Sequence, residues 1–164
     1  MSHTFHQLYF HFVWGTHSRY PAIDRAWRVQ LLNILNDEVK KRGGLPLRHN
    51  AMPDHVHLLV RLPPALAPAT FIGQVKGATA YRLNRELTLR RKFEWQDGYG
   101  VLSLRKEEIE TVARYIDRQE QHHQQDKLSE TLERCEINED DWLLEMQRLA
   151  EAEEKPGEPD SEEN

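Results

Sequence analysis

Apolar and polar residues alternate along four short stretches of the chain, which is the pattern of half-buried β-strands. In the first stretch, residues 7–16, the side chains of Phe10, Phe12 and Trp14 fall on one face. The other three predicted strands lie at residues 45–52, at 55–62 and within 90–104, where Gly98 and Gly100 make the pattern irregular.

Apolar residues recur at helical spacing between these strands and after the last one. The predicted helices lie in residues 21–44, 69–88 and 105–123, and a further one covers 139–152. Asp24 is a plausible N-cap for the first, and Gly43 with Gly44 ends it. The order strand–helix–strand–strand–helix–strand predicts an α+β fold, a ferredoxin-like antiparallel β-sheet packed with helices, followed by an extra C-terminal helix.

Charge is divided unevenly along the chain. Residues 1–125 contain 18 Lys and Arg against 12 Asp and Glu, a net charge of +6, whereas residues 126–164 contain 4 against 15, a net charge of −11, and the two sum to the −5 of the whole chain. The positive part is suited to nucleic acid. The final stretch, EAEEKPGEPDSEEN, has little to bury and is predicted to be disordered. This acidic end is either a solubilising tail or an intramolecular mimic of DNA phosphate.

The bulk properties narrow the class of protein. No apolar run approaches the roughly 20 residues that cross a bilayer, and the N-terminus lacks the layout of a signal peptide. The single Cys135 excludes an internal disulfide framework and fits a reducing cytoplasm as an ordinary thiol. We therefore expect a cytoplasmic protein with no membrane partner.

Two histidines flank one valine in the third predicted strand, in the sequence MPDHVHLLV. Residues two apart in a strand share a face, so His55 and His57 point together to the exposed side, opposite the apolar row that begins at Val56. The pair is suited to one cation but fills only two coordination positions, and the pattern also arises by chance. His11 also points away from the apolar side of its strand, so we expect it near this pair.

The predicted helix at 105–123 carries two stripes. The buried stripe consists of Ile109, Val112, Ala113 and Ile116, and the second consists of Glu108, Tyr115, Gln119 and His122. Tyr115 and Gln119 are four residues apart and project side by side. The second stripe is either a border between core and water, or a site at which a phenol attacks phosphorus.

Five stretches of the chain resemble one family. MPDHVHLLV resembles the histidine–apolar–histidine (HUH) motif, and VARYIDRQEQHH resembles the tyrosine helix of the single-tyrosine HUH transposases. FVWGTHSRYP, VKGATAYRLN and FEWQDGYG resemble the same family, and all five occur in the expected order across residues 5–123. These are the transposases of the smallest bacterial insertion sequences, with the REP-associated tyrosine transposases as relatives.

The resemblance implies a transposase with an HUH catalytic domain over residues 1–125 and an acidic helix and tail over 126–164. It implies Mg²⁺ or Mn²⁺ held by His55, His57 and Gln119. Tyr115 would attack a phosphate of single-stranded DNA to give a 5′-phosphotyrosine and a free 3′-OH, and a 3′-OH from another strand would reverse the step. Because one phosphate ester replaces another of similar energy, no ATP or other nucleotide cofactor is required, and the sequence has no Walker loop.

Other residues compete for these roles. Tyr99 lies in a glycine-flanked turn and Tyr81 lies on the second predicted helix, so either is a rival nucleophile. His122 and His123 are candidates for further metal ligands or for DNA contacts. Alternatively, they are cations placed at a helix C-terminus, where the helix dipole stabilises positive charge.

The resemblance also implies DNA hairpins as partners, and basic residues cluster on and after the second predicted helix. Trp95 would stack on an unpaired base. The candidate DNA contacts are Arg19, Lys76, Arg82, Arg85, Arg90, Arg91, Lys92, Trp95, Arg105 and Lys106. A solvated charge run is the alternative for each of them.

Several functional alternatives stay open. The chain is a transposase of a mobile element, in a homodimer or alone, or a domesticated REP-associated enzyme that acts on chromosomal repeats in the nucleoid. A non-catalytic nucleic-acid-binding relative would share the sheet but make no use of Tyr115. A metal-binding or structural module would show no salt-sensitive affinity for single strands.

Overall fold

The computed structural model describes residues 4–125, 128–135, 143–144 and 146–148 of the chain. The strands are β1 (Tyr9–Gly15), β2 (Leu45–Ala51), β3 (His55–Arg61) and β4 (Gly100–Leu104). The helices are α1 (Arg28–Lys41), α2 (Pro68–Glu86), α3 (Ile109–Asp117), α4 (Gln119–Gln124) and α5 (Glu130–Glu133). Short 3-10 turns occur at His17–Arg19 and Lys106–Glu108.

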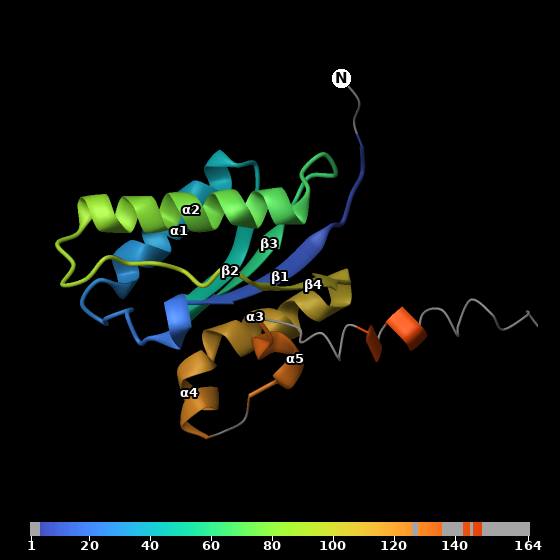
Figure 1. Ribbon diagram of the computed structural model, residues 1–164. Coiled ribbons are helices and arrows are strands. Elements are labelled where there is room, and N and C mark those ends of the chain that lie inside the picture. Colours follow the sequence, from blue (N-terminus) through green and yellow to red (C-terminus); the bar gives the residue numbers. More distant parts are fainter. Residues whose placement is uncertain (1–3, 126–127, 136–142, 145, 149–164) are drawn as a thin grey trace, which may run out of the picture.

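The four strands form one sheet in the order β2-β3-β1-β4, with every neighbouring pair antiparallel. This is the strand order of the ferredoxin-like fold, so the predicted fold class is confirmed. Figure 1 shows α1 and α2 on one side of the sheet and α3, α4 and α5 on the other, which gives three layers. Among the described residues, no helix has both the length and the apolar character needed to cross a membrane.

The larger core lies between the sheet and the helices α1 and α2. It contains the apolar row predicted for the third strand, Val56, Leu58 and Val60, all fully buried. Leu31 from α1 and Phe71 from α2 belong to the same core. As predicted, α1 ends at a glycine pair: Gly43 has a φ of +82°, a left-handed conformation that favours glycine.

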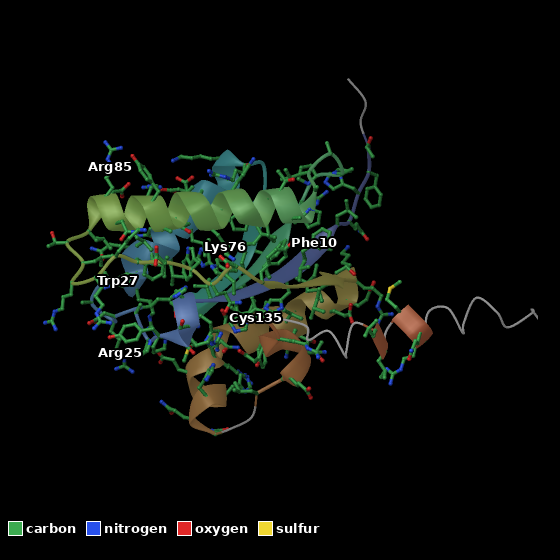
Figure 2. All side chains as sticks on the ribbon, in the orientation of Figure 1. Phe10, Arg25, Trp27, Lys76, Arg85 and Cys135 are labelled. Atoms are coloured by element: carbon green, nitrogen blue, oxygen red, sulfur yellow. The ribbon has the colours of Figure 1, made fainter. Side chains whose placement is uncertain are left out.

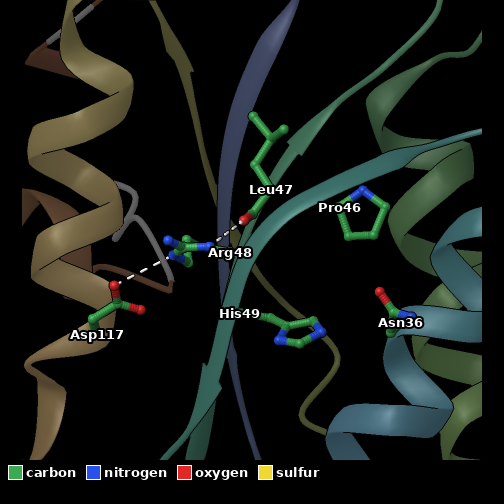
Figure 3. A pocket seen from close by; sticks show the side chains of 6 residues that line it. All are labelled: Asn36, Pro46, Leu47, Arg48, His49 and Asp117. Atoms are coloured by element: carbon green, nitrogen blue, oxygen red, sulfur yellow. Dashed lines mark hydrogen bonds and ion pairs between the residues drawn. The ribbon is translucent and has the colours of Figure 1, made fainter.

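A second, smaller core holds α3 against the opposite face of the sheet. Leu59 of β3 packs there against Val112 and Ile116 of α3. Two polar contacts with β2 fix the end of the helix: Asn50 Nδ2 donates to the Ile116 carbonyl at 2.9 Å, and the Arg48 guanidinium pairs with Asp117 at 3.3 Å (Figure 3). Together these contacts set the position of the residues just before Asp117.

The prediction of one continuous helix over residues 105–123 was wrong. The chain makes a 3-10 turn first, in which the Glu108 carboxylate accepts the Arg105 N–H at 2.7 Å, and α3 begins at Ile109. At Arg118 the backbone leaves helical geometry, and its N–H is shared among the carbonyls at the end of α3. A new helix, α4, then starts in a different direction. The helix predicted at 139–152 and the acidic tail fall largely outside the described residues.

Candidate active site

Two histidines and one glutamate meet on the α3 side of the sheet. The Nε2 atoms of His55 and His57 each lie 3.3 Å from an oxygen of the Glu133 carboxylate. Both rings are fully buried, and neither Nε2 atom has a well-aligned hydrogen-bond partner within the described part of the chain. Two imidazole nitrogens and a carboxylate aimed at one point fit a divalent cation, so this group could bind a metal ion.

The histidine pair was expected on an exposed face, and this expectation was wrong. His55 and His57 do point away from the large core, as their spacing predicts, but residues of α3, α4 and α5 contact and cover them. The reason is that this side of the sheet carries a core of its own, so helices pack on both faces.

The outer nitrogens of both histidines are hydrogen-bonded. His55 Nδ1 lies 2.7 Å from the Asp54 carboxylate, and His57 Nδ1 lies 2.9 Å from Nε2 of His11. His11 therefore lies beside the pair, as predicted from its place in the first strand. A metal-binding histidine usually donates its outer N–H to such an acceptor, which fixes the ring and directs the inner lone pair at the cation.

Arg19 reaches the site from a tight turn after β1. Its Nε lies 3.1 Å from Asp54, so it orients the carboxylate that holds His55. Ser18 and Arg19 have φ values of +53° and +55°, a left-handed conformation that non-glycine residues rarely adopt. The predicted DNA contact Arg19 is thus an ion-pair partner within the site in this structure.

Tyr115 brings its phenol to the same carboxylate. Its hydroxyl donates to Glu133 Oε1 at 2.5 Å and accepts from the Ser129 N–H at 3.1 Å. The ring also stacks on His122, with centroids 4.8 Å apart. Burial, and then the negative Glu133 beside it, raise the pKa of Tyr115 to about 12. The predicted nucleophile and the predicted cation ligands therefore meet within one chain.

Gln119 is fully buried at the edge of this group. Its Nε2 donates to Glu133 Oε1 at 3.2 Å, and its Oε1 lies 3.1 Å from the His123 ring. The hydrogen bonding therefore points the amide N–H at the site and the amide oxygen away from it. The oxygen position that the resemblance implies for Gln119 is taken here by Glu133.

Sequence reasoning missed Glu133 as a site residue. It lies in a short helix within the region assigned to the acidic C-terminal part, and no spacing relates it to the histidines. Ser129 caps this helix by accepting the Leu132 N–H, which is the local signal that α5 forms. The hypothesis of a DNA-phosphate mimic concerned the final acidic stretch, residues 151–164, which does not include Glu133.

Charge in the site is arranged around this carboxylate. Burial alone would raise the pKa of Glu133, but the close contacts of its carboxylate with the His55 and His57 rings hold that pKa well below its ordinary value. Burial acts to lower the pKa of His55, but the Asp54 and Glu133 carboxylates outweigh burial and raise this pKa above its ordinary value. Burial lowers the pKa of His57. Glu133 is therefore an anion that depends on the histidines for stabilisation.

Besides Arg19, three candidate DNA contacts are buried or partly buried and have partners within the protein. Lys76 is buried, and its Nζ donates to the carbonyls of residues 96, 97 and 98 at 2.7, 2.9 and 2.8 Å. Trp95 is buried and donates to Thr79 at 3.1 Å. Arg82 pairs with Glu38 and Glu86. Lys76 and Trp95 thus have structural contacts in place of the exposed positions that DNA contacts require.

The other candidate DNA contacts are exposed. Arg85 projects from the outer side of α2, whereas Lys76 points inward from the same helix (Figure 2). Arg90, Arg91 and Lys92 line a groove of about 660 Å³ after α2, in which the Arg91 guanidinium lies 5.2 Å from the Tyr20 ring centre. The remaining two, Arg105 and Lys106, are also exposed.

The rival tyrosines lie on the other side of the sheet. Tyr99 packs against Phe12 of the large core, with ring centres 6.1 Å apart. Tyr81 is exposed on α2 and accepts a hydrogen bond from Arg85. Neither ring lies on the sheet face that carries His55 and His57.

Known proteins are similar to this chain in sequence and in fold. A family model described as "Transposase IS200 like" matches residues 4–119. The ISDra2 transposase TnpA of Deinococcus radiodurans is 29% identical over 119 residues, which cover 70% of this chain and 85% of that protein.

Two solved structures are similar to this one. A crystal structure of a transposase from Deinococcus radiodurans R1 has a TM-score of 0.60 and 26% identity, covering 73% of this chain and 95% of that one. A REP-associated tyrosine transposase bound to a REP hairpin has a TM-score of 0.56 and 15% identity, covering 75% of this chain and 74% of that one, a likeness of fold alone. Because the family model matches well over half of the sequence, this chain belongs to the IS200-like transposase family, for which DNA cleavage and strand transfer are the implied activity.

Proposed function

We propose that this protein cleaves and rejoins single-stranded DNA through a covalent bond between Tyr115 and a 5′-phosphate. The observation that carries the proposal is the convergence of three side chains on one point. Glu133 Oε1 lies 2.5 Å from the Tyr115 hydroxyl and 3.3 Å from His57 Nε2. The other carboxylate oxygen, Glu133 Oε2, lies 3.3 Å from His55 Nε2. A phosphate at this point would touch the phenol and the cation ligands together.

The reaction exchanges one phosphate ester for another. The Tyr115 oxygen forms a bond to phosphorus, the bond from phosphorus to the 3′ oxygen breaks, and that oxygen leaves as a 3′-OH. A 3′-OH from another strand then attacks the phosphotyrosine and restores the phenol. No external energy source is needed, since the bonds made and broken are of the same kind.

The histidines His55 and His57 would hold Mg²⁺ or Mn²⁺ through their Nε2 atoms. When bound, the cation would polarise the phosphate and stabilise charge that develops on its oxygens. Asp54 and His11 orient the two rings from behind. Gln119 borders the same volume, and rotation of its amide would present its oxygen as the third ligand.

We infer that the DNA is single-stranded near the cleavage point and forms hairpins. The REP hairpin in the structural relative supports this substrate class, although that relative shares the fold at only 15% identity. The exposed Arg90, Arg91 and Lys92 beside Tyr20 supply cations and an aromatic ring, the two elements that bind single strands.

The test is a covalent adduct. The purified protein is incubated with Mn²⁺ and labelled hairpin oligonucleotides, and the products are separated on a denaturing gel. We expect a protein–DNA adduct on Tyr115, identified by peptide mass spectrometry. Tyr115→Phe and His57→Ala should abolish the adduct, while Tyr81→Phe, on the other side of the sheet, should leave it unchanged.

Two outcomes contradict the proposal. If Tyr99→Phe removes the adduct and Tyr115→Phe does not, the nucleophile is a different residue. If no variant or condition gives an adduct while the protein still binds single strands, the chain is a non-catalytic nucleic-acid-binding relative.

A further inference from the structure

The buried amide of Gln119 lies between the site and a third histidine, His123. Its Nε2 donates to Glu133 Oε1 at 3.2 Å, and its Oε1 lies 3.1 Å from Nε2 of His123. The Gln119 side chain is fully buried, and buried amides need hydrogen-bond partners at both ends. The orientation of this amide therefore depends on what His123 offers on one side and on what the site holds on the other.

The short helix α4 brings His123 to the amide. Gln119 and His123 are four residues apart on this helix, and residues at that spacing lie side by side. The ring centre of His123 is also 5.0 Å from that of His55, so His123 packs at the rim of the site. His123 is only partly buried and lines a cavity of about 210 Å³, so water can reach its ring.

A neutral imidazole can serve either orientation of the Gln119 amide. The ring has one N–H and one bare nitrogen, and the proton can change places between them through water. With the proton on Nε2, His123 donates to the amide oxygen, as the orientation in the structure requires. With the proton on Nδ1, Nε2 of His123 accepts the amide N–H instead, and the Gln119 oxygen then faces the site.

A cation in the site favours the second orientation. The Nε2 atoms of His55 and His57 are aimed at the volume that the Gln119 amide borders, and a hard cation there binds an oxygen and repels an N–H. The amide N–H then needs an acceptor on its outer side. Both histidine ligands already have an outer partner that fixes the ring, and His123 lies in the same relation to Gln119.

We propose that His123 is a positioning residue of the metal site: its Nε2 accepts the Gln119 amide N–H and so directs the amide oxygen at the cation. This inference rests on the proposed function of the same site, in which Gln119 supplies the third ligand. Each of the three ligands then has an outer partner that sets its orientation.

The test measures Mn²⁺ affinity by isothermal titration calorimetry, with the full-length protein and without DNA. His123→Phe keeps an aromatic ring but removes the acceptor, and His123→Gln restores a polar atom at the end of the side chain. His123→Ala gives the same comparison if the Phe ring disturbs α4. Gln121→Ala is the control, since Gln121 is an exposed residue of the same helix.

A second background separates positioning from packing. Gln119→Glu places a carboxylate at the ligand position, and a carboxylate presents an oxygen in either orientation, so it needs no outer partner. His123→Phe is therefore combined with Gln119→Glu, and its effect is compared in the two backgrounds. Glu133 is unchanged in every protein, so its own contribution to Mn²⁺ binding cancels in the comparison.

We expect His123→Phe to weaken Mn²⁺ binding by roughly 10- to 100-fold, the usual effect of losing the outer partner of a ligand. His123→Gln and Gln121→Ala should bind Mn²⁺ about as tightly as the unmodified protein. In the Gln119→Glu background, adding His123→Phe should change the affinity little.

Two results would overturn the positioning role. One is an unchanged Mn²⁺ affinity in both His123→Phe and His123→Ala. The other is an equal loss of affinity in the two backgrounds, since His123 would then only fill space beside the site.

The adduct assay keeps this proposal distinct from the catalytic one. Weaker Mn²⁺ binding in His123→Phe alone, with no adduct even from the unmodified protein, would support the positioning role and contradict the catalytic proposal. An adduct from the unmodified protein, together with equal Mn²⁺ affinity in all His123 variants, would support catalysis and overturn the positioning role.

Discussion

His11 and His57 form a buried histidine pair, with His11 Nε2 2.9 Å from His57 Nδ1 and the two rings stacked at 5.1 Å. Burial, and then the neighbouring His57, lower the pKa of His11 to about 3, so His11 is neutral at physiological pH. A cation on Nε2 of His57 requires the proton to lie on Nδ1. His11 Nε2 accepts the hydrogen bond that this Nδ1–H donates. Strand β1 therefore contributes to a site whose histidine ligands lie on β3.

Replacing His11 tests this relationship. His11→Ala should lower the affinity for Mn²⁺ by about 10- to 100-fold, the usual effect of losing the outer partner of a metal-binding histidine. Isothermal titration calorimetry with Mn²⁺ measures it. His17→Ala, an exposed histidine two residues beyond β1, is the control. Equal Mn²⁺ affinity in the two variants would show that His11 only fills space.

Lys76 should matter for stability and not for DNA. Lys76→Met removes the hydrogen bonds to the carbonyls of residues 96–98 and should lower the free energy of unfolding by about 2–4 kcal/mol. Urea denaturation measures this loss, and Arg85→Ala on the outer side of the same helix should change it little. A weaker salt dependence of DNA binding in Lys76→Met, with unchanged stability, would contradict the structural role.

The groove after α2 should bind the DNA backbone. Replacing Arg90 and Arg91 together by Ala should reduce the slope of log affinity against log salt by roughly 0.7 for each lost single-strand phosphate contact. Lys40→Ala, an exposed cation on α1, is the control. The measurement is oligonucleotide binding at several salt concentrations, and an unchanged slope in the double variant would remove the groove from the DNA path.

Stability should fall at acid pH through Glu38. This buried carboxylate has a pKa of about 2. Burial acts to raise the pKa, but hydrogen bonds from Lys41, Arg42 and Arg82 outweigh burial and lower it. Because the folded pKa lies below the unfolded value of 4.5, the stabilisation is full above about pH 4.5 and is lost as the pH falls towards 2. It amounts to roughly 3 kcal/mol.

Glu38→Gln should therefore flatten the acid limb of the stability curve, measured by urea denaturation between pH 6 and 3. Glu107→Gln is the control, since that carboxylate is exposed in the 3-10 turn before α3. If both variants keep the acid loss of the unmodified protein, other carboxylates cause it.

The sequence predicted those parts of the fold and site that follow from local periodicity. A period of two placed His55 and His57 together, and a spacing of four placed Tyr115 beside Gln119. The ferredoxin-like order followed from the sequence of elements. Each of these depends on neighbours along the chain.

The features that sequence analysis missed depend on contacts between distant segments. Glu133 reaches the histidines because α5 folds back over the sheet, and no pattern relates residue 133 to residue 57. Lys76 and Trp95 are charged or amphipathic residues that alone suggest a surface, yet carbonyls and Thr79 satisfy them inside. The break at Arg118 is a further case, since the turn is fixed by how α3 docks on β2.

The pairing of β3 ties folding and chemistry to a single alignment. His57 lies opposite Val13 on one side and Asn50 on the other, and Val56 lies opposite Trp14. Neighbouring positions in a strand face opposite sides of the sheet. Inserting or deleting one residue within β3 would therefore turn the imidazoles towards the large apolar core and turn the aliphatic side chains of β3 towards the site proposed for the DNA phosphate. Selection for a stable protein and selection for an active one therefore act on the same residue spacing. A one-residue shift in this strand would abolish both the packing of the core and the metal site.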